Sequence, residues 1–138
     1  MENRQPLENA ASRQEEDWRE QLDELSYAVL RESATESPFT GKYYRHNDDG
    51  HYYCKACNAL LFESDNKFDS GCGWPSFDQA VEGAISYVQD KSYGMIRTET
   101  KCANCNSHLG HVFDDGPRET TGKRYCINSV CLDFDKKI

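Results

Sequence analysis

Two short cysteine motifs decide how this chain can fold: residues 54–57 read Cys-Lys-Ala-Cys and residues 102–105 read Cys-Ala-Asn-Cys. In a C-x-x-C motif a tight turn lets two thiolates converge, so two motifs supply four sulfur ligands at tetrahedral corners. Zinc suits such a site because it has no redox chemistry and binds thiolates well. A single motif could be a thioredoxin-like redox pair, but two of them, each beside a predicted strand, favour one structural zinc ion. The predicted ligands are Cys54, Cys57, Cys102 and Cys105.

The composition explains why the chain needs such a site. Its 138 residues are one domain's worth, and Leu, Ile, Val and Phe together number only 23. With a net charge of −8, so few aliphatic residues would normally indicate disorder. Sixteen aromatic residues and seven cysteines argue against disorder, because aromatic rings bury large areas and metal binding contributes directly to folding. We therefore expect a small folded domain in which loss of Cys54 unfolds or destabilises the chain.

Charge and hydropathy exclude several classes of function. The isoelectric point near 4.9 does not fit the basic surface that binding to nucleic-acid phosphates requires. No apolar run approaches the roughly 18 residues of a membrane span, and the first thirty residues lack the features of a signal peptide. We expect no nucleic-acid or membrane partner and a cytoplasmic location, where cysteines serve metal binding or catalysis more often than disulfide frameworks.

The N-terminal part of the chain is predicted to be helical after a flexible tail at residues 1–12. Ser12 and Glu15 have the S-x-x-E spacing of a capping box, which predicts a helix start near residue 13. Asp23 could equally cap a second helix, so a break there is allowed. We expect residues 13–138 to form a single domain.

One apolar stripe is predicted along this helical region. It consists of Trp18, Leu22, Leu25 and Val29. Their spacing is that of a helix face laid across the domain, and Pro38 and Gly41 end the region.

From residue 43 the pattern changes to short strands between turns. Asp49-Gly50 predicts a hairpin between residues 43–45 and 51–53, and DDGPRETTG at residues 114–122 is a polar loop. Further strands are expected within residues 59–62, 85–88, 95–99, 109–113 and 124–134. The predicted class is mainly β and antiparallel, with an N-terminal helical segment.

Of the three cysteines left over, Cys126 stands in the most suggestive surroundings. On a strand, alternation places Arg124, Cys126 and Asn128 on one face. A guanidinium near a thiol lowers the pKa of the thiol and raises the fraction of nucleophilic thiolate. A strand with one polar face is an equal alternative from spacing alone.

Two other segments carry groups that could react. Cys72 lies between Gly71 and Gly73 and is followed by Trp74, so the segment is either a turn anchored by a buried Trp or a loop that carries a second redox thiol. His108 and His111 could act as general acids or as hydrogen-bonded structural residues. Cys131 is expected to be a small buried hydrophobe.

Taken together, these motifs resemble the B-type peptide methionine sulfoxide reductases. The resemblance runs from about Leu22 to Phe134 and includes both C-x-x-C motifs. The other matching segments are SPFTG at 37–41, SGCGWPSF at 70–77, HLGHVF at 108–113 and RYCINS at 124–129.

The resemblance implies an enzyme that reduces methionine-R-sulfoxide in proteins, a repair activity under oxidative stress. It implies that Cys126 attacks the sulfoxide and becomes a sulfenic acid, and that Cys72 resolves it as a disulfide that thioredoxin reduces. His111 is the candidate acid, and Trp74 holds the substrate's methyl group. The other implied catalytic positions are His108, Asp115, Arg124 and Asn128.

The implied fold, the Mss4-like or methionine sulfoxide reductase B fold, has two small antiparallel sheets around the four-cysteine zinc site. We expect a monomer whose partners are oxidised proteins and thioredoxin. One departure from the family's pattern is Val130-Cys131, where two small residues are usual, so Cys131 as a second resolving thiol stays open. The main alternative is a non-enzymatic zinc module that binds a protein partner, which would need neither Cys126 nor Cys72.

Overall fold

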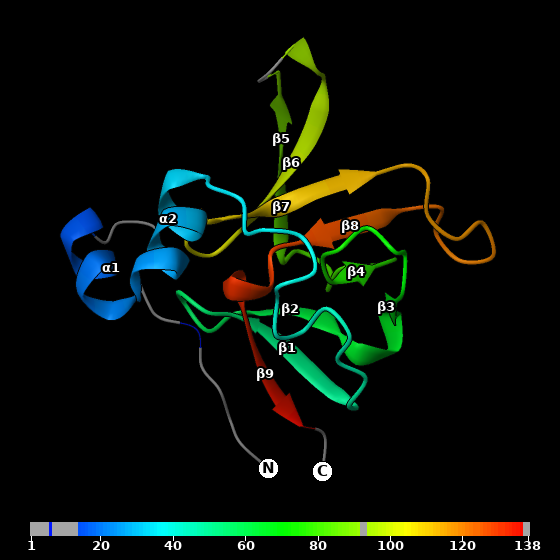
Figure 1. The fold of residues 1–138 in the computed structure, drawn as a ribbon, viewed down its shortest axis with the longest axis horizontal. Coiled ribbons are helices and arrows are strands. Elements are labelled where there is room, and N and C mark those ends of the chain that lie inside the picture. Colours follow the sequence, from blue (N-terminus) through cyan, green and yellow to red (C-terminus); the bar gives the residue numbers. More distant parts are fainter. Residues whose placement is uncertain (1–5, 7–13, 92–93, 137–138) are drawn as a thin grey trace.

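The computed structural model of the protein describes residues 6, 14–91 and 94–136. The predicted tail at residues 1–12 lies outside these ranges except for Pro6. Two helices, α1 and α2, precede a series of short strands (Figure 1).

The break allowed at Asp23 is confirmed, because α1 spans Glu15–Gln21 and α2 spans Glu24–Glu32. The Asp23 carboxylate caps α2 by accepting the Ser26 N–H at 3.3 Å. The capping box predicted for the first helix is wrong. Glu15 is the first helical residue rather than the third, and Asp17 accepts the Gln14 N–H at 3.2 Å instead.

The predicted apolar stripe holds at three of its four positions. Trp18, Leu22 and Val29 are buried, but Leu25 is 49% exposed. The prediction fails at Leu25 because the chain breaks at Asp23, so α2 presents a new face to the protein. That face buries Tyr27 and Leu30 along with Val29.

The strands form two antiparallel sheets, as predicted. The smaller sheet has the order β2-β1-β9 and the larger has the order β3-β4-β8-β7-β6-β5. In the smaller sheet β1 is Gly50–Cys54, β2 is Leu60–Glu63 and β9 is Leu132–Lys136. In the larger sheet β3 is Lys67–Phe68, β4 is Ser76–Phe77, β5 is Ile85–Asp90, β6 is Arg97–Cys102, β7 is His108–Phe113 and β8 is Arg124–Ile127. Two 3-10 turns, η2 at Ser64–Asn66 and η4 at Ser129–Cys131, precede β3 and β9.

One prediction about the strands is wrong. Residues 43–45 form turns rather than a strand, and β1 pairs with β2 and β9. Gly50 is thus a strand residue instead of a turn residue, and its N–H donates to Ser64 Oγ at 2.9 Å. The strands expected within residues 124–134 are β8 and the start of β9; η4 separates them, so they join different sheets.

Aromatic side chains form much of the core, as the composition suggested. Phe62 and Phe77 stack with ring centroids 4.3 Å apart, and Tyr52 meets Phe77 edge-on at 5.2 Å. All three are fully buried. Because Tyr52 and Phe62 come from the smaller sheet and Phe77 from the larger, this cluster joins the two sheets.

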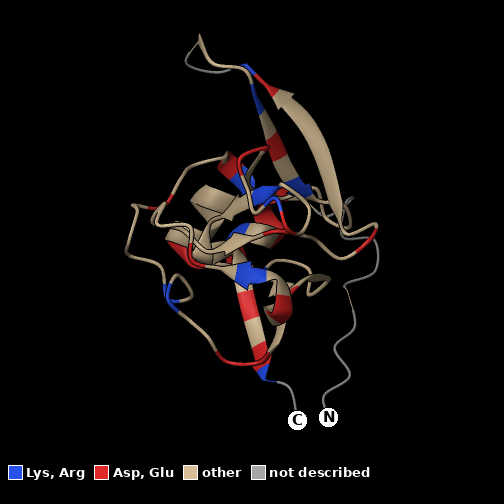
Figure 2. Cartoon of the chain, turned by 90° about the vertical axis from the view of Figure 1, so that its right-hand side faces the viewer, with Lys and Arg blue, Asp and Glu red and all other residues tan. Residues whose placement is uncertain are grey.

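The described residues include no helix long and apolar enough to cross a membrane. Along the described chain, segments with Lys and Arg are interspersed with segments with Asp and Glu (Figure 2).

Candidate active site and metal cluster

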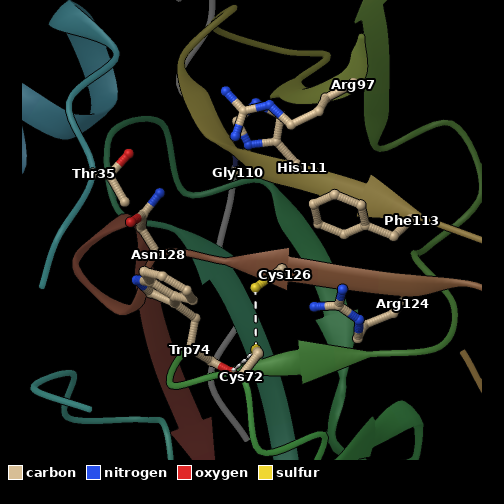
Figure 3. A pocket seen from close by; sticks show the side chains of 10 residues that line it. All are labelled: Thr35, Cys72, Trp74, Arg97, Gly110, His111, Phe113, Arg124, Cys126 and Asn128. Atoms are coloured by element: carbon tan, nitrogen blue, oxygen red, sulfur yellow. Dashed lines mark hydrogen bonds between the residues drawn. The ribbon is translucent and has the colours of Figure 1, made fainter. Parts of the chain in front are cut away.

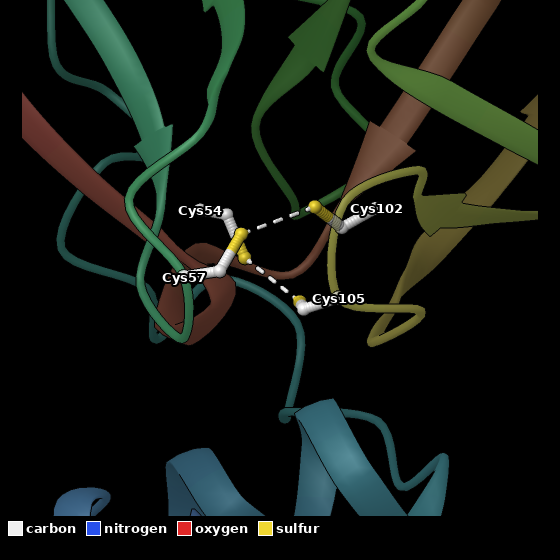
Figure 4. A group of neighbouring side chains, drawn as sticks. All are labelled: Cys54, Cys57, Cys102 and Cys105. Atoms are coloured by element: carbon white, nitrogen blue, oxygen red, sulfur yellow. Dashed lines mark hydrogen bonds between the residues drawn. The ribbon is translucent and has the colours of Figure 1, made fainter. Parts of the chain in front are cut away.

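The four cysteines of the two C-x-x-C motifs meet where the two sheets join (Figure 4). Their sulfur atoms lie within 4.8 Å of one another and all four residues are buried. Two of the separations are 3.7 Å, between Cys54 and Cys105, and 3.5 Å, between Cys57 and Cys102. A tetrahedron with metal–sulfur bonds of about 2.3 Å has edges of about 3.8 Å. The cluster therefore could hold a metal ion, and it leaves no position open to a substrate.

An asparagine closes each of the two motifs in the same way. Asn58 and Asn106 adopt left-handed backbone conformations, with φ of 71° and 65°. Each N–H donates at 2.8 Å to the carbonyl of the first cysteine of its motif. The repeated Cys-x-x-Cys-Asn sequence carried this signal, because Asn tolerates a positive φ better than most residues.

The helices are tied to both motifs. The Gln21 side chain donates to the Ala56 carbonyl at 2.6 Å, and Arg31 Nη1 donates to the Cys105 carbonyl at 2.9 Å and to Ser107 Oγ at 3.0 Å. The helical segment thus covers the cluster and holds its two turns at a fixed distance.

The second site is a cavity of about 320 Å³ on one face of the larger sheet (Figure 3). Cys126 on β8 and Cys72, from the loop before β4, face each other there with their sulfur atoms 3.2 Å apart. Both are free thiols. The lining residues are Thr35, Cys72, Trp74, Arg97, Gly110, His111, Phe113, Arg124, Cys126 and Asn128.

Glycines allow the loop around Cys72 to take its shape. Gly71 and Gly73 have φ of 75° and 97°, which side chains rarely permit. At Gly73 a Cβ atom would also lie 2.7 Å from Pro38. The two glycines thus bring Cys72 against Cys126, while Trp74 is fixed by its Nε1–H, which donates to the Glu36 carbonyl at 3.1 Å.

The two thiols share a proton. The hydrogen bond from Cys126 is the largest cause that lowers the pKa of Cys72, to about 4. The same hydrogen bond, followed by burial, raises the pKa of Cys126. Arg124 opposes that rise, as predicted in direction, but its effect is smaller than that of Cys72. The pair therefore loses its first proton more readily than an isolated thiol would.

His111 is paired with a carboxylate that the sequence did not reveal. Its Nε2 lies 2.8 Å from Asp90 Oδ2, and Asp90 also accepts from Arg97 at 3.2 Å. His111 and Cys126 are direct partners across β7 and β8, so both side chains lie on the same face of the sheet. The contact with Asp90 thus holds the His111 imidazole on the face of the sheet that carries Cys126.

His108 lies deeper and away from the cavity around Cys126. It is 4% exposed, and its Nδ1 lies 2.7 Å from Glu99 Oε2. Burial lowers the pKa of His108, although Glu99 opposes that effect. The neutral imidazole is therefore favoured, which suits a supporting residue better than an acid.

Arg124 is oriented by two neighbours. Its guanidinium forms two hydrogen bonds with Asp115, at 2.9 and 3.2 Å, and lies 4.5 Å from the centre of the Phe113 ring. Asp115 itself does not line the cavity. Its position is that of a residue acting through Arg124.

Asn128 clamps two segments together at the edge of the cavity. Its amide nitrogen donates to the Leu109 carbonyl at 2.9 Å, and its oxygen accepts the Glu36 N–H at 3.0 Å. Glu36 is also buried and accepts the Val130 N–H at 2.9 Å. Since Glu36 also holds Trp74, one buried segment positions both an amide and an aromatic wall of the cavity.

The structure brings six of the eight predicted site residues into one cavity and leaves two outside it. Cys72, Trp74, His111, Arg124, Cys126 and Asn128 line the cavity, whereas His108 and Asp115 do not. Sequence reasoning missed Asp90, Arg97 and Glu99, for which only strand pairing provides the link to the site. It also missed Gly110, where a Cβ atom would lie 2.0 Å from the Cys126 carbonyl.

Cys131 is fully buried, as predicted. It lies in η4 rather than on a regular strand, and its Sγ donates to the His108 carbonyl at 3.3 Å. Burial raises the pKa of this thiol.

Sequence comparison identifies close relatives over most of the chain. The SelR domain matches residues 22–136. The peptide methionine sulfoxide reductase MsrB of Variovorax paradoxus is 64% identical over 113 residues, which cover 81% of this chain and 82% of the relative. The protein of the same name from Pseudomonas fluorescens is 59% identical over 120 residues, which cover 86% and 91%.

Structural comparison finds the same fold in a distant protein. The crystal structure of the Mis18 'Yippee-like' domain superposes with a TM-score of 0.50 at 18% identity. The match covers 65% of this chain and 98% of that domain. At this identity the likeness shows the fold alone.

Proposed function

This chain belongs to the SelR family of B-type peptide methionine sulfoxide reductases, and we propose that its reaction runs through a Cys126 sulfenic acid and a Cys72–Cys126 disulfide. The chain is thus a peptide-methionine (R)-S-oxide reductase rather than a non-enzymatic zinc module. The observation that carries the proposed mechanism is the 3.2 Å approach of the two sulfur atoms inside one cavity.

In the first step the Cys126 sulfur attacks the sulfoxide sulfur while a proton is delivered to the sulfoxide oxygen. The sulfur–sulfur bond formed by this attack then breaks as the protonated oxygen passes from the methionine sulfur to the Cys126 sulfur, so that methionine leaves and Cys126 holds the oxygen as a sulfenic acid. His111 is the proposed acid because it lines the cavity and is paired with Asp90. Trp74 provides an apolar wall for the substrate's methyl group.

In the second step the Cys72 thiolate attacks the Cys126 sulfenic acid, so that a disulfide forms and water leaves. Thioredoxin, as the proposed reductant, then converts the disulfide back to two thiols by exchange. The 3.2 Å separation of the two sulfur atoms supports this assignment, since only a short movement brings them to disulfide bonding distance. Cys131 has no proposed redox role because it is fully buried.

We propose that the four-cysteine cluster holds one zinc ion with a structural role. Its four buried sulfur ligands and their spacing support this. Zinc would supply folding free energy and no chemistry to the reaction, since all four positions are filled by protein.

The wider setting is also proposed. Residues 13–138 would act as one domain and as a monomer, repairing oxidised proteins under oxidative stress. A reducing compartment such as the cytoplasm, where cysteines serve metal binding or catalysis more often than disulfide frameworks, is part of this proposal.

The experiment that tests this function compares wild-type protein with Cys126→Ser on a methionine-R-sulfoxide peptide, with dithiothreitol as reductant. We expect methionine formation by the wild type and none by the variant. Cys131→Ser is the matched control and should keep most of the activity. Equal rates in wild type and Cys126→Ser, or no reduction by either, would contradict the assignment.

A further inference from the structure

A second cavity adjoins the one around Cys126. It has a volume of about 460 Å³ and shares Thr35, Arg97 and His111 with the first cavity. Its other lining residues are Ser33, Ala34, Asp90, Glu99 and His108. The space next to the reacting sulfur therefore continues across β7 toward β6 and β5.

Strand pairing shows which residue lies at the far end of the sheet in this direction. Cys126 pairs with His111, His111 with Glu99, and Glu99 with Val88. Directly paired residues share a face, so Val88 lies on the same face as Cys126, on the edge strand β5. Three strand spacings separate the two residues, a distance of about 14 Å.

The opposite direction is closed. There Cys126 pairs with Ser76, which is 1% exposed and whose hydroxyl contacts Cys72 at 3.3 Å. A polypeptide with one side chain in the cavity can therefore extend toward β5 but not toward β4.

An exposed apolar side chain, that of Val88, lies at this open end on the active-site face. Six large hydrophobic residues are exposed in the described part of the chain, and four of them belong to the β5–β6 hairpin or directly precede β6. These four are Tyr87, Val88, Met95 and Ile96. Tyr87, next to Val88 on β5, points to the opposite face of the sheet, where its hydroxyl lies 2.6 Å from that of Tyr125. The hairpin extends beyond the body of the protein in both views (Figures 1 and 2).

We propose that the active-site face between Cys126 and Val88 is the docking surface for the polypeptide that carries the oxidised methionine. The inference rests on the proposed function, because it is the sulfoxide at Cys126 that fixes the register of the bound chain. An extended chain advances about 3.3 Å per residue, so a distance of about 14 Å corresponds to roughly four residues. The second cavity receives the residues next to the sulfoxide, and Val88 packs against an apolar side chain about four positions away.

Peptide kinetics test this surface, with dithiothreitol as reductant and with thioredoxin in a parallel series. The substrates are N-acetyl-methionine-R-sulfoxide amide and alanine-based peptides with one methionine-R-sulfoxide and one leucine, moved stepwise along either side of it. We expect kcat/KM to rise about fivefold, on one side only, when leucine stands about four residues from the sulfoxide. Val88→Ser should abolish that rise and leave reduction of the small amide unchanged, which also shows that the variant is folded. Leu25→Ser, at a comparably exposed apolar residue on α2, is the control and should keep the leucine preference.

Three results would overturn the inference. They are a rate independent of leucine position, an equal loss in Leu25→Ser, and an effect of Val88→Ser that appears only with thioredoxin as reductant, which would assign the surface to thioredoxin. These results leave the proposed function intact as long as the small amide is reduced. Failure of the wild type to reduce the small amide would instead overturn the function itself.

Discussion

At the scale of single residues, the behaviour of Cys126 depends more on Cys72 than on Arg124. The Arg124 guanidinium stands two positions from Cys126 on the same strand, and it was the only influence on the pKa of Cys126 that the sequence suggested. The contact with Cys72 joins residues 54 positions apart and depends on how the glycine loop folds over β8. Asp90 was missed for the same reason, since only the pairing of β5, β6 and β7 brings it to His111.

The first prediction concerns the titration of Cys72. In the wild type the pKa of this thiol is lowered to about 4, mainly by the hydrogen bond from Cys126. Cys126→Ala removes that donor, so the pKa of Cys72 should rise toward the usual thiol value of about 8.5. Iodoacetamide labelling of Cys72, followed by peptide mass mapping from pH 4 to pH 10, measures the shift. An unchanged labelling profile would show that the two thiols do not share a proton.

The second prediction concerns the partner of His111. Asp90→Asn replaces the carboxylate that is paired with the proposed acid His111, so kcat/KM with a sulfoxide peptide should fall about tenfold or more. Labelling of Cys126 by iodoacetamide should stay unchanged, which separates loss of the acid from damage to the nucleophile. Asp65→Asn, at an exposed residue in η2, is the control. A variant as active as this control would exclude the Asp90–His111 pair from the reaction.

At the scale of elements, the structure differs from the sequence-based expectation where short-range signals compete with pairing between distant strands. Asp49-Gly50 predicted a hairpin, but β1 pairs instead with β9 from the far end of the chain. β3 and β4 have two residues each, too few for a period-two pattern to be visible. The antiparallel class and the break at Asp23 were predictable, because alternation and helix capping are local.

The third prediction concerns how the helices hold the metal cluster. Arg31→Met keeps the aliphatic part of the side chain and removes the hydrogen bonds to Cys105 and Ser107. The buried Cys105 carbonyl then loses this charged donor, so the free energy of unfolding should fall by about 2 kcal/mol. Urea denaturation measures it, with Arg118→Met, at an exposed loop residue, as control. Equal stability of the two variants would show that α2 is not needed to hold the cluster.

At the scale of the whole molecule, the two sheets are joined by the cysteine cluster and by the aromatic core. The two C-x-x-C motifs made the cluster predictable, because the chemistry of four thiolates admits few alternatives. Its location was not predictable, since a pair of motifs does not say which sheets they join. The cysteine cluster and the aromatic residues together compensate for the scarcity of aliphatic residues. Tyr52, Phe62 and Phe77 belong to the same buried core as the four cysteines.

The fourth prediction is that metal removal unfolds the protein rather than slowing it. A chelator, or Cys102→Ser, should abolish both the near-ultraviolet circular dichroism signal and the cooperative thermal transition, because metal binding of this kind is coupled to folding. Elemental analysis of the purified wild type should give one zinc per chain. A metal-free protein with an unchanged thermal transition would contradict the structural role.

The most direct test of the proposed mechanism is mass mapping after a single turnover without reductant. With one equivalent of a methionine-R-sulfoxide peptide, wild-type protein should form methionine and lose two hydrogen atoms as a Cys72–Cys126 disulfide. Cys72→Ser should form the same methionine and retain one oxygen on Cys126, which dimedone traps. Methionine formed without either product, or a disulfide that involves Cys131 in the wild type, would contradict the assignment of Cys126 as nucleophile and Cys72 as its resolving partner.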